Sequence, residues 1–185
     1  AALVSNGAGF VQVDENGKYY NAAETDAFLE AMNWVMDMVS KYEMKAPEGA
    51  EWNYFESAFI NGEVTLQVHE DYFAGSLANM EDDYGFVFFP KGPRVDTYLY
   101  APSDNVMVIP TCYDADRAWK IAFAYNLFTN PTPGYTDSDD WKNGYYQKYR
   151  DERAVDETIA MMREPEHQFV WYSDMVTGYD LGSQY

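Results

Sequence analysis

Four neighbouring residues, His69, Glu70, Asp71 and Tyr72, carry side chains well suited to recognising a polar ligand. They stand where a stretch of alternating apolar and polar residues ends and a helix is predicted to begin. In open α/β sheets, ligands generally bind at such junctions. A tyrosine ring can stack on a sugar, and carboxylates can accept hydrogen bonds from hydroxyl groups. A structural interpretation is equally open, with Tyr72 in the core and Glu70 as an ordinary acid at a helix start.

The residue inventory offers little support for catalysis. The chain has two histidines, His69 and His167, and no Gly-x-Ser-x-Gly motif that would place a nucleophile beside either of them. Phosphate-binding, dinucleotide-binding and His-Glu-x-x-His motifs are also absent from the sequence. A carboxylate pair of the glycoside hydrolase type stays possible, because the chain has 31 acidic residues. We therefore expect a protein that is not an enzyme, with glycoside hydrolysis as the alternative.

Cofactor and metal binding are not expected either. The single cysteine, Cys112, excludes both an intrachain disulfide and a cysteine-built metal site. The acidic turn at 14–17, whose Asn16-Gly17 dipeptide predicts a hairpin, lacks the ligand spacing of a calcium loop. The acidic cluster at 137–140 is better explained as the first turn of a helix that begins near Trp141.

Composition restricts the partners. With 12 basic and 31 acidic residues, the formal net charge is −19, which repels nucleic acid and anionic membranes. Hydrophobic residues make up 47% of the chain, which is too much apolar surface for a disordered segment. No run of apolar residues is long enough to insert into a membrane. At 185 residues, the chain fits one domain.

Helical and alternating patterns follow one another along the chain and predict an α/β fold. A capping box at Asn21 and Glu24 predicts a helix that ends before Pro47. Further helices are predicted over 52–59, 115–128, 141–149 and 155–162, and strands over 10–13, 64–68, 84–89, 97–100 and 105–109. The 115–128 helix is expected to be capped by Asp114 or a neighbouring residue. Its apolar face, which we expect to be buried, is formed by Ala118, Ile121, Ala122, Tyr125 and Phe128. In the 155–162 helix, Val155, Ile159 and Met162 are expected to face inward.

The stretch from Phe59 to Pro93 links several of these elements. Asn61 and Gly62 predict a helix end, because glycine adopts the left-handed conformation that follows a helix. The segment after Tyr72 is expected to bury Phe73, Leu77 and Met80, and a tight turn is expected at 90–93.

This stretch resembles a known family. The motif consists of an aromatic, Gly-Glu, an apolar residue, a second aromatic and a Pro-x-Gly-Pro turn, here Phe59, Gly62, Glu63, Leu66, Tyr72, Pro90, Gly92 and Pro93. It resembles the carboxyl-terminal lobe of the extracellular solute-binding proteins of sugar-type ABC importers, the maltose-binding-protein-like family 1.

The resemblance implies roles for particular residues. Tyr72 takes the position where the family often has a ligand-stacking tryptophan, and Glu70 or Asp71 would accept hydrogen bonds from sugar hydroxyls. The chain would cross a hinge near 101–110, so Asp104 and Asn105 would border the cleft, although 101–104 is equally explained as a proline-containing turn. Trp171 and Tyr172 are candidates for a further ring at the cleft.

The resemblance also implies the architecture and the role of the whole protein. The fold would be a periplasmic-binding-protein-like type II lobe, a mixed sheet flanked by helices, with 1–185 a single α/β domain and a fragment of a two-lobed receptor. The helix at 115–128 would pack on the other lobe. The receptor would bind a carbohydrate outside the cytoplasm, as a periplasmic protein or a surface lipoprotein, and deliver it to the ABC transporter permease. A carbohydrate-binding accessory module and a structural surface protein remain alternatives.

Overall fold

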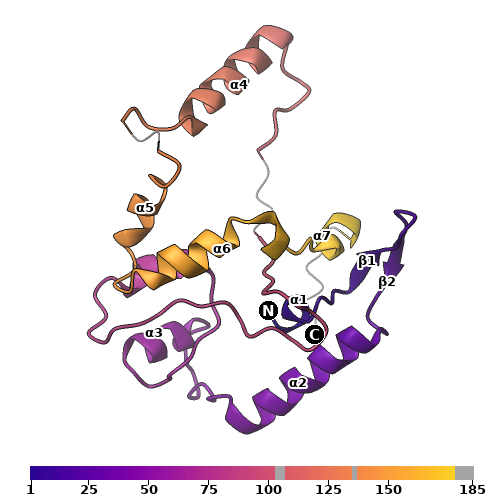
Figure 1. Cartoon of the computed structure of the whole chain (residues 1–185), viewed down its shortest axis with the longest axis vertical. Coiled ribbons are helices and arrows are strands. Elements are labelled where there is room, and N and C mark those ends of the chain that lie inside the picture. The colour runs from indigo at the N-terminus through magenta and orange to yellow at the C-terminus, as the bar shows by residue number, and fades with distance from the viewer. Residues whose placement is uncertain (103–106, 135–136, 178–185) are drawn as a thin grey trace. The chain divides into compact units, whose positions relative to one another are not determined.

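The computed structural model describes residues 1–102, 107–134 and 137–177 (Figure 1). The chain divides into two compact units, one formed by Ala1–Pro102 with Tyr146–Tyr185 and the other by Ser103–Tyr145. The first boundary falls inside the range 101–110, where a hinge crossing is predicted. The larger unit is therefore built from two segments that are separate in the sequence.

The described residues combine helices with one small sheet, which is compatible with an α/β class. The first segment of the larger unit contains α1 (Ala2–Ser5), β1 (Val11–Val13), β2 (Tyr19–Asn21), α2 (Asp26–Tyr42), α3 (Tyr54–Ile60) and the 3₁₀ helix η1 (Asp71–Leu77). The second segment contains the π-helix η2 (Ala154–Ile159), α6 (Ala160–Met162), the 3₁₀ helix η3 (Pro165–His167) and α7 (Tyr172–Thr177). The remaining two helices are α4 (Ala115–Thr129) and α5 (Lys142–Tyr146).

The hairpin predicted around the Asn-Gly turn is confirmed. Strands β1 and β2 pair antiparallel, with Val11 opposite Asn21. The Asp14 carboxylate accepts hydrogen bonds of 2.9 Å from the backbone N–H groups of Asn16 and Lys18. Gly17 adopts φ +78°, the left-handed conformation that glycine tolerates best.

Helix α2 begins four residues later than its sequence pattern predicts. The side chain of Thr25, not that of Asn21, caps the helix by accepting a hydrogen bond from the Phe28 N–H. Asn21 ends β2, and its side chain accepts a hydrogen bond from the Ala23 N–H. Pairing with β1 therefore keeps Asn21 out of the helix. The helix ends at Tyr42, before Pro47 as expected.

The strands predicted beyond the hairpin are not present among the described residues. Residues 64–68, 84–89 and 107–109 form no ladder, and 97–100 contributes one isolated bridge, from Tyr100 to Gln168. Leu66 is 87% exposed, so the alternating segment has no buried face. The physical reason is that a strand needs a neighbour to accept its hydrogen bonds, and an alternating pattern does not specify one.

Two groups of buried side chains stabilise the larger unit. In the first, Phe10 meets Phe28 and Trp171 edge to face, with ring centroids 5.0 and 6.0 Å apart. Further buried side chains lie in and after η1 and in the second segment, which are linked by hydrogen bonds from Tyr149 to the Asp71 carbonyl and from Thr158 to the Phe86 carbonyl. They are Phe73, Leu77, Met80, Tyr84, Tyr149, Val155 and Ile159. The predicted burial of Phe73, Leu77, Met80, Val155 and Ile159 is confirmed.

Helix α4 is confirmed at both ends, and the described residues of its own unit do not cover its predicted apolar face. Asp114 caps the helix by accepting a 2.8 Å hydrogen bond from the Arg117 N–H, and Asn130 follows its last turn. No residue of α4 is buried against the described part of the chain, and Phe128 is 85% exposed. The periodic pattern identifies an apolar face but not what covers it. Among the described helices, none has the length and apolar character needed to cross a membrane.

Arg150 holds the loop that follows η1. Its guanidinium donates hydrogen bonds to the backbone carbonyls of Met80, Glu81 and Asp82, and it lies 3.2 Å from the Asp83 carboxylate. A guanidinium carries five donors in a planar fork, which suits several carbonyl groups at once. This one side chain therefore fixes four consecutive loop residues.

Replacing Arg150 with alanine is expected to lower the free energy of unfolding by about 1–3 kcal/mol, because these carbonyls lose a charged donor. Lysine should not restore the loss, since an ammonium lacks the planar fork. Urea denaturation measures both variants. Arg153→Ala is the matched control, because Arg153 is exposed and its described bonds go to Asp151, and we expect a change below about 0.5 kcal/mol. If Arg150→Ala and Arg153→Ala unfolded at the same urea concentration, Arg150 would not be the residue that fixes the loop after η1.

Candidate functional site

The candidate site lies where the extended chain enters η1. Glu70 occupies the N-cap position of this helix and Asp71 its first turn. The ring of His69 is fixed from two sides, because its Nδ1 accepts a 2.9 Å hydrogen bond from the Glu70 N–H and its Nε2 lies 3.3 Å from Glu56 Oε1. Since Nδ1 accepts, a neutral ring carries its proton on Nε2 and donates it to Glu56.

Two aromatic side chains flank the His69 ring. Phe73 stacks beneath it, with centroids 4.2 Å apart and planes 20° apart, and is itself buried. Tyr72 meets the same ring edge to face at 5.4 Å and 78°. Tyr72 is 63% exposed, so it is not a core residue. The Tyr72 ring is therefore exposed to solvent and contacts a His69 ring that is itself stacked on buried Phe73.

Acidic residues precede Tyr72 in the sequence and also lie on and after helix α3. Glu70 is exposed, and its side chain makes no capping hydrogen bond to η1. Asp71 is half-buried, and its backbone carbonyl accepts a 3.3 Å hydrogen bond from the Tyr149 hydroxyl. On helix α3, the Tyr54 hydroxyl donates to Glu63, and this hydrogen bond raises the pKa of Tyr54. The site therefore offers carboxylate oxygens that can accept hydrogen bonds from ligand hydroxyl groups, and the residues named here supply no cationic side chain.

The other predicted site residues lie elsewhere or outside the described residues. Trp171 packs in the cluster of Phe10 and Phe28, and Tyr172 meets Tyr19 edge to face at 5.8 Å. Both rings contact residues in or next to the β1–β2 hairpin. No described contact joins Trp171 or Tyr172 to His69 or Tyr72. Asp104 and Asn105 lie outside the described residues.

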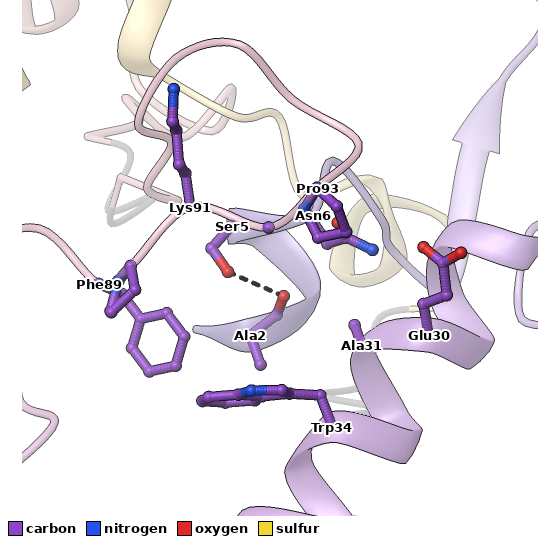
Figure 2. A pocket seen from close by; sticks show the side chains of 11 residues that line it. Ala2, Ser5, Asn6, Glu30, Ala31, Trp34, Phe89, Lys91 and Pro93 are labelled. Carbon is purple, nitrogen blue, oxygen red and sulfur yellow. Dashed lines mark hydrogen bonds between the residues drawn. The ribbon is translucent and has the colours of Figure 1, made fainter.

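A pocket of about 280 Å³ lies between α1, α2 and residues 89–93, here called the 89–93 turn although the tight turn predicted for 90–93 is displaced to 93–94. Figure 2 shows the Trp34 ring seen edge-on, below Ala2 and beside Phe89. Trp34 and Phe89 meet edge to face, with centroids 5.7 Å apart and planes at 84°. The pocket is lined by Ala2, Ser5, Asn6, Glu30, Ala31, Trp34, Phe89, Pro90, Lys91, Gly92 and Pro93.

Asn6 holds the wall of this pocket together. Its side-chain amide donates a 2.8 Å hydrogen bond to the Ala27 carbonyl of α2 and accepts one of 3.2 Å from the Arg94 N–H. The Gly92 N–H donates to the Ser5 carbonyl at 2.8 Å. Helix α1, helix α2 and the turn are therefore joined through one buried residue.

The Glu30 carboxylate at the rim of the pocket is paired with Arg94. Arg94 donates two hydrogen bonds, of 2.8 and 2.6 Å, to the two carboxylate oxygens of Glu30. These bonds lower the pKa of Glu30 and raise the pKa of Arg94. Lys91 points away from the Trp34 ring (Figure 2) and donates to the Asp96 carbonyl at 3.0 Å. The carboxylate of the rim is therefore neutralised, and the Lys91 ammonium is directed away from the aromatic wall.

Sequence reasoning missed this pocket. The Pro-x-Gly-Pro turn at 90–93 was recognisable, but its neighbour Trp34 is far away in the sequence. One available signal was a tryptophan next to the buried stripe of α2, where a polar residue would be expected. Pairing Trp34 with Phe89 required the fold.

In comparisons with family models, curated proteins and solved structures, no match to this chain was found. Within the described ranges, no three His, Cys, Asp or Glu side chains converge to hold a metal ion. The function must therefore be argued from the site and from the sequence motif.

Proposed function

We propose that this chain binds a carbohydrate outside the cytoplasm, as part of the solute-binding component of an ABC importer. The sequence motif between Phe59 and Pro93 supports the family, and the arrangement around Tyr72 supports the ligand class. In this proposal the chain forms most of a type II lobe, and the ligand is handed to the membrane permease after the receptor closes around it. No covalent bond is made or broken.

The observation that carries the proposal is the supported, exposed ring of Tyr72. Its partner His69 is fixed by Glu56 and by the Glu70 N–H, and buried Phe73 stacks under the imidazole. An aromatic ring held in place before binding loses little conformational entropy when a ligand stacks on it.

The chemistry follows from the polarity of a sugar. One face of a pyranose ring carries mainly C–H groups and can stack on the exposed Tyr72 ring. The hydroxyl groups at its edge need acceptors, and Glu70 and Asp71 supply carboxylate oxygens at the start of η1. The acidic surroundings disfavour an anionic ligand, so we propose a neutral mono- or oligosaccharide.

Calorimetric titration of the full chain with mono- and oligosaccharides tests the proposal. We expect saturable binding of one sugar class without product formation, weakened about tenfold by Tyr72→Ala, because loss of the stacking surface removes roughly 1.4 kcal/mol. Tyr42→Ala is the matched control, since Tyr42 is 73% exposed on α2 and makes no contact with this site in the described structure. The Tyr42→Ala variant should bind the sugar with the same affinity as the unmodified chain.

Three results would overturn parts of the proposal. Binding that Tyr72→Ala and Tyr42→Ala weaken equally would remove Tyr72 from the site. The absence of binding to any saccharide would remove the ligand class. Release of a reducing sugar would replace the receptor with a glycoside hydrolase, and the acidic residues near His69 would then be the first to test.

A further inference from the structure

We propose that the pocket between α1, α2 and the 89–93 turn is a second binding site, specific for a small uncharged ligand with an aromatic ring. The site is separate from the proposed sugar site, since its lining includes none of the residues 69–72. The proposal does not depend on carbohydrate binding.

The lining determines the chemistry of the occupant. Carbon atoms of Trp34, Phe89 and the two prolines of the turn form the walls, and Ala2 and Ala31 leave open space between them. At about 280 Å³, the pocket is near the lower limit of small-molecule sites. A single aromatic ring fits this space better than a flexible chain, because stacked and edge-to-face contacts with Trp34 and Phe89 add to area burial.

The rim argues that this ligand carries no charge. Each polar side chain of the lining already has a partner: Ser5 bonds the Ala2 carbonyl, Asn6 bonds Ala27 and Arg94, Glu30 bonds Arg94, and Lys91 bonds the Asp96 carbonyl. A charged ligand would lose its hydration, while the Glu30 carboxylate is already paired with Arg94 and the Lys91 ammonium points away from the Trp34 ring. The net charge of −19 further disfavours an anion.

The pocket is also preformed. Gly92 lies so close to Asn6 that a Cβ there would come within 2.8 Å of the Asn6 side-chain carbons, and the Gly92 N–H bonds the Ser5 carbonyl. The turn is thereby fixed over α1, while Trp34 stays 45% exposed. A rigid concave surface that leaves a tryptophan uncovered requires little reorganisation to bind a ring.

Ligand-detected ¹⁹F NMR with 4-fluorophenol tests the proposal. We expect saturable broadening with a Kd of about 1 mM, and at least about tenfold weaker binding of 4-fluorobenzoate and 4-fluorobenzylammonium. Trp34→Ala should weaken 4-fluorophenol binding about tenfold, whereas Trp52→Ala, which removes a highly exposed tryptophan outside the pocket, should not.

A second pair of variants protects the test against misfolding of Trp34→Ala. Ala2→Phe places a ring inside the pocket and should abolish binding, while Ala2→Ser keeps the space open and should preserve it. Tyr72→Ala should leave 4-fluorophenol binding unchanged, which separates this site from the proposed sugar site.

The proposal is overturned by several outcomes. Absence of saturable binding, equal affinity for the charged analogues, or unchanged binding in both Trp34→Ala and Ala2→Phe would each exclude it. Sedimentation that shows a dimer, lost in Ala2→Phe, would mean that a side chain of a second copy occupies the pocket instead.

Discussion

Gly92→Ala is expected to lower the free energy of unfolding by about 2–4 kcal/mol. An added Cβ would lie 2.7 Å from Asn6 Cγ and 2.8 Å from Asn6 Cβ. Asn6 cannot move aside at low cost, because it is buried and bonded to both Ala27 and Arg94. The substitution therefore either overpacks the turn or breaks hydrogen bonds that join three segments.

Thermal and urea denaturation measure this effect, and Gly85→Ala is the matched control. A Cβ at Gly85 would meet nothing within 4 Å, so that variant should be neutral or slightly stabilising. In an Asn6→Ala background, Gly92→Ala should be less destabilising, because the amide group that it meets is gone. Additive effects of the two substitutions would show that the Asn6 amide group is not the cause.

Phe10→Ala is the second substitution with a large expected effect, a loss of about 3–5 kcal/mol in the free energy of unfolding. The Phe10 ring lies between Phe28 and Trp171, so its removal leaves a cavity and ends two edge-to-face contacts. Because Trp171 follows η3, this contact also holds the carboxyl-terminal segment against the first residues of the chain.

Chemical denaturation followed by tryptophan fluorescence measures this loss. Phe128→Ala serves as the control, since it makes the same change at a ring that is 85% exposed, and it should alter stability by less than about 0.5 kcal/mol. If the two substitutions were equally tolerated, the cluster around Phe10 would not be a core.

The features that the sequence predicted correctly depend on local chemistry. Asp114 caps α4 through a bond to a residue three positions later, and Gly62 ends α3 with φ +72°. The Asn16-Gly17 turn likewise depends on neighbours in the chain. Such interactions are complete within a few residues, so residue type and spacing are enough to specify them.

The features that the sequence did not predict depend on distant partners. The alternation of Val64, Leu66 and Val68 predicted a strand, but pairing needs a second segment that the pattern does not name. The helical spacing of apolar residues in α4 likewise predicted a buried face, but the spacing does not identify the segment that would cover it. Within the candidate site, the contiguous His69–Tyr72 group could be recognised from sequence, whereas the contact of His69 with Glu56 and the pairing of Trp34 with Phe89 could not.

The contacts between η1 and the segment around Tyr149 have a consequence for the order of events during synthesis. The Tyr149 hydroxyl bonds Asp71 across 78 positions, and Thr158 bonds the Phe86 carbonyl across 72. A ribosome that adds about 5–20 residues per second needs roughly 4–16 seconds to cover such a separation. The Asp71 and Phe86 carbonyls must therefore wait without these partners while residues 103–145 are made. During that interval the segment around η1 is incompletely bonded, and apolar surface left exposed in such a state is prone to aggregate.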